Sequence, residues 1–189
     1  MSAKNKEKKL SSKENFTSKR YRISQFYAIR AITGFSLSPN GKTISYITNT
    51  NGMPNIWTIP IEGGWTSQIT LQENAVSALQ YSPVKNDIIF HSDIKGDENH
   101  QLFLVSDKGG EVEYLTPSHN GAQIQFCTWN KKGTKVLFSS NKRDPRFFDT
   151  YILDINTRTE ECIYECNDIY PFVAAAWSNN ERYVLYQKF

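Results

Sequence analysis

The sequence is poor in cysteine: it has three, Cys127, Cys162 and Cys166, among 189 residues. Cys162 and Cys166 are four residues apart in a segment with the composition of a strand. There they share one face at about 13 Å, which is too far for a disulfide. A CxxxC pair without a neighbouring histidine is also weak evidence for zinc. The cysteines therefore indicate neither a disulfide framework nor a metal site, and nothing in the chain requires an oxidising compartment.

Long apolar runs are missing as well, and no segment approaches the ~20 apolar residues that a membrane-spanning helix needs. Residues 1–20 hold seven lysines and arginines against two glutamates, which leaves 22 − 7 = 15 basic and 19 − 2 = 17 acidic residues for the rest of the chain. No apolar stretch follows this basic segment, as it would in a secretory signal. We therefore expect a cytoplasmic protein with a disordered basic tail over residues 1–20, and no nucleic-acid or membrane partner.

Catalytic motifs are also absent from the sequence. None of its ten glycines belongs to a G-x-S-x-G elbow, a phosphate-binding loop or a G-x-G-x-x-G fingerprint. The histidines, His91, His100 and His119, are scattered, and the sequence identifies no catalytic partner for any of them. The segment 93–100 gathers polar side chains, but a solvated connection between two strands explains it better than a calcium or zinc site does. We therefore expect no catalytic residue, no metal ligand and no cofactor on this chain.

The chain does contain a repeat. A large apolar residue, a polar turn and an alternating strand that ends in an aromatic occur four times, starting 44, 48 and 48 residues apart. The copies are LSPNGKTISY (37–46), YSPVKNDIIF (81–90), WNKKGTKVLF (129–138) and WSNNERYVLY (177–186). After the first two copies, Trp57 and Phe103 are each followed by a glycine pair six residues later and by a threonine thirteen residues later. In the third copy, TYILDINTRT (150–159), an Asn-Thr-Arg turn replaces the glycines. A repeat of this length and composition is typical of β-propeller blades.

Each full repeat predicts four antiparallel strands, which is the content of one blade. In the first repeat we expect strands at about 32–37, 43–48, 55–60 and 65–70. The pair Ile44/Tyr46 and its equivalents should fill the space between neighbouring blades, and the four tryptophans should lie in the core. Four residues that precede the same turn should occupy equivalent positions: Leu37, Tyr81, Trp129 and Trp177.

The predicted fold class is all-β. The chain should form a partial β-propeller ring over residues 21–189, with three complete four-stranded blades and half of a fourth, and packing should begin near Ile23 and Phe26. The predicted blades cover about 32–70, 76–116, 123–166 and 171–189. An incomplete ring leaves unpaired strand edges, so the chain is expected to be a fragment, a truncated gene product or one half of a split protein.

The repeats resemble the amino-terminal propeller of the prolyl oligopeptidase family of serine peptidases, in the branch of the acylaminoacyl peptidases and dipeptidyl aminopeptidases. The turn Ser38-Pro39-Asn40-Gly41-Lys42 and the hairpin IPIEGG (59–64) are shared with TolB-like propellers. The opening ISQFYAIRAITGFSLSPNGKTISYI (23–47) and the stretch SSNKRDPRFFDTYILDINT (139–157) are more specific to the peptidases. The resemblance covers about residues 21–189. It does not include the α/β-hydrolase domain, where that family carries its serine, acid and histidine.

The resemblance implies that this chain limits the access of peptide substrates to a hydrolase domain that it does not itself contain. Its partners would be the missing blades, the hydrolase domain and the peptides on which the parent protein acts. Asn141, Arg143 and Asp144 would lie in a loop between two strands, and Arg143, Asp144 and Arg146 are the candidates for lining a substrate channel. Alternatively, Arg143 and Asp144 only hold their own loop together. A second function stays open: a non-enzymatic TolB-like or WD-type propeller that binds protein partners.

Overall fold

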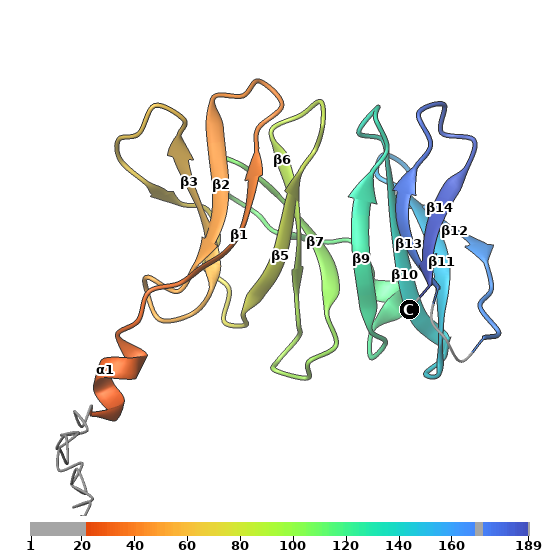
Figure 1. The fold of residues 1–189 in the computed structure, drawn as a ribbon, viewed down its shortest axis with the longest axis horizontal. Coiled ribbons are helices and arrows are strands. Elements are labelled where there is room, and N and C mark those ends of the chain that lie inside the picture. The colour runs from red at the N-terminus through yellow and green to blue at the C-terminus, as the bar shows by residue number, and fades with distance from the viewer. Residues whose placement is uncertain (1–21, 169–171, 189) are drawn as a thin grey trace, which may run out of the picture.

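The computed structural model describes residues 22–168 and 172–188, so the tail expected over residues 1–20 lies outside the described residues. The described chain is all-β apart from a short helix, α1 (Ile23–Tyr27), and one turn of 3-10 helix, η1 (Pro117–His119). Its antiparallel sheets follow one another in chain order (Figure 1). The described residues include no helix that is long and apolar enough to cross a membrane.

Within residues 22–168 and 172–188, four sheets contain all the strands, and every strand pairs with its neighbour in the sequence. Sheet 1 consists of β1 (Ile32–Leu37), β2 (Thr43–Thr48), β3 (Asn55–Pro60) and β4 (Ser67–Gln68). Sheet 2 consists of β5 (Val76–Tyr81), β6 (Asp87–Ser92), β7 (Gln101–Ser106) and β8 (Glu113–Tyr114). Sheet 3 consists of β9 (Ile124–Trp129), β10 (Lys135–Asp144), β11 (Phe147–Asp154) and β12 (Glu160–Tyr164). Sheet 4 consists of β13 (Phe172–Trp177) and β14 (Val184–Lys188).

The strand register confirms that the repeats are structurally equivalent. Leu37, Tyr81, Trp129 and Trp177 each end the first strand of their sheet and pair with the residue seven positions later. Each first strand also contains one irregularity in its pairing, although its position within the strand varies. The periodicity of the sequence therefore reports a repeated pairing pattern, whereas the irregularities are local.

Aliphatic and aromatic side chains fill the space between consecutive sheets. Ile47 and Ile56 of sheet 1 pack with Ile88 and Phe90 of sheet 2, and a second cluster joins sheets 2 and 3 through Ile89, Leu102, Val136 and Phe138. Ile88, Phe90, Val136 and Phe138 are fully buried, as expected of residues between sheets. Alternate residues of one strand thus serve two different interfaces.

The expectation for the tryptophans is wrong at Trp65, which is 94% exposed, whereas Trp129 is 7% exposed. Trp65 follows Gly63 and Gly64, which both have positive φ values. The glycine turn carries the chain away from β3, so that β4 starts at Ser67 instead of residue 65. The first three strands of sheet 1 have the predicted bounds, and only the fourth is shorter than predicted.

Three other local expectations are also wrong. Asn141, Arg143 and Asp144 do not lie in a loop, because β10 continues to Asp144, which pairs with Phe147 across a tight turn. Cys166 lies beyond β12, which ends at Tyr164. Ile23 is mostly exposed, so packing does not begin at this residue, and the side chain of Phe26 lies outside what the structure describes.

One face of sheet 1 has no neighbouring sheet among the described residues. Phe35 and Leu37 are 78% and 51% exposed, whereas Tyr81 and Trp129, the equivalents of Leu37, are 4% and 7% exposed. Sheet 4, at the other end of the row, has two strands and exposes Leu185. The described sheets therefore form an open row and not a closed ring (Figure 1).

Candidate functional site

The candidate residues gather at one end of the sheets, where the second strand of each sheet turns back into the third and the chain passes to the next sheet. We call this the connection end and define it by residues 49–54, 69–75, 93–100, 115–123 and 141–149. It is the end from which α1 leaves sheet 1 in Figure 1.

A buried polar residue holds the connection end of sheet 1 together. Asn55 begins β3 opposite Thr48 and is 1% exposed. Its Oδ1 accepts hydrogen bonds from the Thr70 hydroxyl and from the backbone N–H of Gln72, both at 2.8 Å. The Thr70 hydroxyl in turn accepts the backbone N–H of Ile56 at 2.9 Å. Asn55 therefore fastens the start of β3 to the chain that leaves the sheet, and we call this arrangement a clasp.

Sheet 2 has a clasp of the same kind. Gln101 begins β7 opposite Ser92. Its Oε1 accepts the Thr116 hydroxyl at 3.2 Å, and its Nε2 donates to the carbonyl group of Ala122 at 2.6 Å. The Thr116 hydroxyl accepts the backbone N–H of Leu102 at 3.1 Å. The recurrent threonine of the sequence thus has a structural cause, since it satisfies a buried backbone donor.

In sheet 3 the clasp residue is charged. Asp149 lies opposite Ser140, in the position of Asn55 and Gln101, and its side chain is fully buried. It accepts two hydrogen bonds from the Arg143 guanidinium, at 2.7 and 2.8 Å, and a third from the backbone N–H of Cys166 at 2.8 Å. Arg143 also donates to the carbonyl group of Cys166 at 2.7 Å. A buried carboxylate requires such partners, so Arg143 supplies the charge that Asp149 needs.

The structure places the three predicted channel residues in two separate ion pairs. Arg143 binds Asp149, whereas Asp144 binds Arg146 at 2.8 Å. The hydrogen bond with Asp149 raises the pKa of Arg143. Hydrogen bonds from Arg146 lower the pKa of Asp144 to about 2. These contacts are close to the alternative hypothesis, in which Arg143 and Asp144 only hold their own loop together. They differ from it in that Arg143 pairs with Asp149 and not with Asp144. A role in lining a channel stays a prediction.

Sequence reasoning missed Asp149, although a signal for it was present. In each of the first three repeats a polar residue stands two positions before the aromatic residue of the third strand. These pairs are Asn55 and Trp57, Gln101 and Phe103, and Asp149 and Tyr151. Aligning the third strands by that aromatic would have shown a polar residue at a position that the strand pairing buries.

His119 joins two residues that are distant in the sequence. Its Nδ1 lies 2.8 Å from the Ser140 hydroxyl, and its Nε2 lies 2.9 Å from Glu160 Oε2. The Ser118 hydroxyl donates to Glu160 at 2.8 Å. The sequence identifies no partner for His119, and the structure supplies two, Ser140 and Glu160. Its partners lie on β10 and β12, about twenty and forty residues later, so only the fold brings them together.

The serine, histidine and glutamate do not form an accessible catalytic triad. His119 and Ser140 are both fully buried, and a nucleophile must reach its substrate. Burial favours the protonated form of Glu160, but hydrogen bonds from His119 and Ser118 outweigh it and lower the pKa of Glu160. The cluster therefore fastens η1, which leads into sheet 3, to the strands of that sheet.

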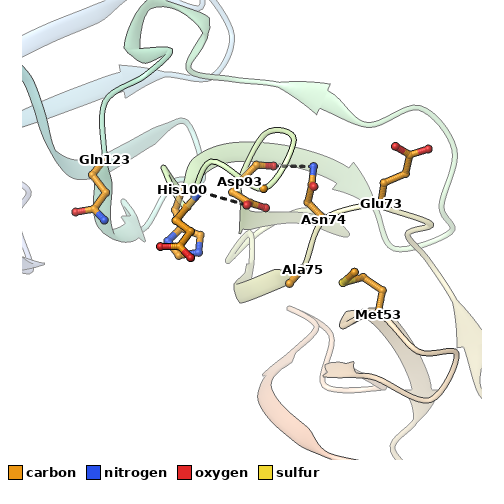
Figure 2. A pocket seen from close by; sticks show the side chains of 9 residues that line it. Met53, Glu73, Asn74, Ala75, Asp93, His100 and Gln123 are labelled. Atoms are coloured by element: carbon orange, nitrogen blue, oxygen red, sulfur yellow. Dashed lines mark hydrogen bonds between the residues drawn. The ribbon is translucent and has the colours of Figure 1, made fainter. Parts of the chain in front are cut away.

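A hollow of about 490 Å³ opens at the connection end beside sheet 2. Its lining includes three acidic residues, Glu73, Asp93 and Glu98, together with His100 and Gln123, and it includes no lysine or arginine among the described residues. Figure 2 shows the hydrogen bond of 3.2 Å from the Asn74 amide to the carbonyl group of Asp93. We call this the acidic hollow. Its electrostatics favour cationic or donor-rich groups over anions.

The segment that forms much of the acidic hollow joins β6 to β7, as the sequence predicted for residues 93–100. Asp93 Oδ2 accepts the backbone N–H of Glu98 at 3.3 Å, and Asp97 accepts that of Asn99 at 3.0 Å. Within the described residues, no group of three or more histidine, cysteine, aspartate or glutamate side chains could hold a metal ion.

Comparison with known proteins gives one curated relative and several structural likenesses. No family model matches the sequence. Dipeptidyl aminopeptidase BIII of Pseudoxanthomonas mexicana is 29% identical over 122 residues, which is 63% of this chain and 18% of the relative. The putative TolB from Agrobacterium tumefaciens has a TM-score of 0.62 at 22% identity, over 85% of this chain and 59% of that one.

Two solved peptidases share the fold at lower identity. The tricorn protease has a TM-score of 0.64 at 11% identity, over 83% of this chain and 15% of that one. An acylaminoacyl peptidase in complex with Z-Gly-Gly-Phe-chloromethyl ketone has a TM-score of 0.53 at 13% identity, over 76% of this chain and 26% of that one. The likenesses support a TolB-like propeller of the kind found in peptidase-family proteins, which confirms the resemblance inferred from the repeats. The chain spans less than two thirds of each of these proteins.

Proposed function

We propose that this chain is part of the propeller of a peptidase-family protein, and that the propeller limits the access of peptide substrates to an α/β-hydrolase domain outside the chain. Sheets 1 to 3 are then complete blades, and sheet 4 is the first half of another. The observation that carries the proposal is the 122-residue match to a dipeptidyl aminopeptidase, of which the match spans only 18%.

The uncovered face of sheet 1 supports a larger ring. The equivalents of Leu37 in sheets 2 and 3 are buried against the preceding sheet, whereas Leu37 itself is half exposed. A further sheet packed on this face would bury Phe35 and Leu37 in the way that sheet 1 buries Tyr81. Such burial contributes about 25 cal/mol for each Å² of apolar surface.

The acidic hollow supports the handling of peptides. Its carboxylates and its lack of lysine and arginine suit the positively charged amino end of a peptide better than the carboxyl end. The hollow lies at the connection end, where loops from sheets 1 and 2 and the start of sheet 3 meet. In this proposal that end of the propeller faces the substrate.

The first test is the gene sequence beyond the codon for Phe189. Further repeats of 44 to 48 residues followed by a G-x-S-x-G elbow would support the proposal. A stop codon or unrelated sequence would contradict it and favour a propeller that binds protein partners. A fluorophosphonate probe should label the parent protein and leave the isolated chain unlabelled, because an activated serine is needed for labelling.

The second test measures peptide selection in the parent protein. Glu73→Lys, in the acidic hollow, should raise KM about two- to fivefold for a peptide with a free amino end and should leave KM for its acetylated form unchanged. Glu62→Lys, on the turn between β3 and β4, is the matched control. Equal effects of the two variants would contradict a role of the hollow in peptide binding.

A further inference from the structure

A second hollow, of about 420 Å³, lies between sheets 2 and 3, and we call it the inter-sheet hollow. Its lining includes Gln80, Ile89 and His91 of sheet 2 and Ile124 and Gln125 of β9. His100 lies on the border between this hollow and the acidic one. The volume is in the range of small-molecule sites, which is about 300–1,000 Å³.

The register of sheet 2 explains why the polar residues share the hollow. Gln80 pairs with Ile89, and Ala78 pairs with His91. Gln80 and His91 are therefore diagonal neighbours on one face of the sheet, at a separation of about 7 Å. Ile89, on the same face, packs with Val136 and Phe138 of sheet 3. Both polar side chains thus face the neighbouring sheet.

Both polar groups lack a hydrogen-bond partner among the described residues. The Oε1 atom of Gln80 is buried and accepts no hydrogen bond. His91 is 9% exposed, and its ring nitrogens are not among the buried unpaired atoms, so they stay within reach of solvent. Buried polar groups are nearly always paired, because an unpaired one is costly. The unpaired Gln80 Oε1 on the wall of the hollow, with the His91 ring beside it, indicates that something else pairs with it.

The inter-sheet hollow has no acidic side chain in its lining, unlike the acidic hollow beside it. No lysine, arginine, aspartate or glutamate belongs to its described lining. Burial and, to a lesser extent, the charge of His100 lower the pKa of His91 to about 4. His91 is therefore uncharged at neutral pH and offers one N–H donor and one nitrogen acceptor. A charged ligand would lose its hydration here without an aspartate, glutamate, lysine or arginine in the lining to pair with it.

We propose that the inter-sheet hollow binds an uncharged, flat apolar group that ends in a hydroxyl, the chemistry of a phenol such as the side chain of tyrosine. The ring lies between the apolar walls formed by Ala78, Ile89 and Ile124. The hydroxyl donates to Gln80 Oε1 and accepts the N–H of His91, so that the buried Gln80 oxygen gains a partner. This site is independent of the peptidase proposal, because it depends only on sheets 2 and 3.

Equilibrium dialysis of the whole chain tests the proposal with four small probes. 4-Methylphenol should bind at about one molecule per chain. Toluene lacks the hydroxyl, tyramine is a cation and 4-hydroxyphenylacetate is an anion, so each should bind about tenfold more weakly or worse. Equal binding of toluene would overturn the proposal, because the hollow would then be a simple apolar gap. The absence of 4-methylphenol binding up to its solubility limit would also overturn it.

A matched pair of variants tests the assigned acceptor. Gln80→Leu keeps the approximate size of the side chain and should reduce the affinity for 4-methylphenol about tenfold, to that for toluene. Gln72→Leu is the control, because its side chain lies outside the hollow and makes no hydrogen bond to a described residue. Unchanged affinity in a folded Gln80→Leu protein would overturn the assignment. If this variant does not fold, the four probes on the unaltered chain still decide the proposal.

Discussion

At the scale of single residues, Asp149 differs from its equivalents in charge. Asn55 and Gln101 hold the same position in sheets 1 and 2 with neutral amides. Asp149 performs the same fastening with a carboxylate and therefore depends on Arg143. The bidentate geometry suits a guanidinium, which presents its donors in a fixed fork.

Replacement of Asp149 tests the clasp. Asp149→Ala should lower the free energy of unfolding by about 2 kcal/mol, because it leaves the backbone N–H of Cys166 and the Arg143 fork without their acceptor. Asp149→Asn should cost less, since Asn55 fills the same role in sheet 1. Urea denaturation measures both changes.

The control for this prediction is Asp144→Asn, which breaks the more exposed pair with Arg146 and should change stability little. Arg143→Met should lower the free energy of unfolding less in the Asp149→Asn protein than in the unaltered protein, because no buried charge is then left unpaired. Independent, additive effects of these two substitutions would contradict the clasp.

The ionisation of Glu160 should make the free energy of unfolding depend on pH. Its pKa in the folded protein is lower than its ordinary value of 4.5. The ionised carboxylate thus contributes stability that is fully present above about pH 4.5 and is lost as the pH falls through the lower folded pKa. Glu160→Gln should flatten the decline in unfolding free energy between about pH 5 and pH 3. Glu161→Gln, at the exposed neighbouring position, is the control and should leave the pH dependence of the unfolding free energy as it is in the unaltered protein. An equally steep pH dependence in Glu160→Gln would contradict the prediction.

At the scale of strands and turns, the sequence predicted the bounds of a strand where turn residues mark both of its ends. β1, β2 and β3 have the predicted bounds because alternation and turn residues define both of their ends. β4 is shorter because Gly63 and Gly64 set the exit direction of the turn, which no alternation reveals.

The site was less predictable than the strands. Arg143, Asp144 and Arg146 do lie together at the connection end, but their pairing depends on β10 continuing to Asp144, which brings Arg143 opposite the start of β11. The contact between His119 and Glu160 spans 41 residues and three strands. A linear sequence gives no register between a connection and a later sheet, so contacts of this kind need coordinates.

Two turn glycines give a matched test of how neighbouring sheets pack. Gly41 and Gly133 lie in equivalent turns with φ values of +68° and +63°. A Cβ on Gly41 would meet nothing within 4 Å, whereas one on Gly133 would lie 2.6 Å from Val84 Cγ2 and 2.8 Å from the Ser82 hydroxyl.

Gly41→Ala should therefore lower the free energy of unfolding by about 1 kcal/mol through backbone strain alone. Gly133→Ala should lower it by about 2 kcal/mol or more, because the side chain of the neighbouring sheet must also move. Chemical denaturation compares the two variants. Equal losses would show that the turns of sheets 2 and 3 are not in contact in solution.

At the scale of the whole molecule, the open row predicts association. The isolated chain should self-associate, because Phe35 and Leu37 on sheet 1 are exposed whereas the equivalents of Leu37 in sheets 2 and 3 are buried. In addition, the edge of β14 near residues 183–187 pairs with no other strand in the described part of the chain. Size-exclusion chromatography with light scattering measures the mass.

Variants separate the two possible contacts. Phe35→Glu should shift the protein toward a monomer if the face of sheet 1 is responsible, and Leu185→Lys should do so if the edge of sheet 4 is. Leu71→Glu is the control, since Leu71 is 82% exposed in the connection between sheets 1 and 2. A stable monomer of the unaltered chain would count against the open row as a fragment of a ring.

The clasps also divide the molecule mechanically. Each one closes within its own repeat, as Asn55 does with Thr70 and Gln72, before the chain enters the next sheet. Under a force applied between the two ends of the protein, each clasp should therefore break in a separate event. We expect extension to proceed in discrete steps of about 150 Å, the contour length of one repeat, because the sheets would unfold one after another.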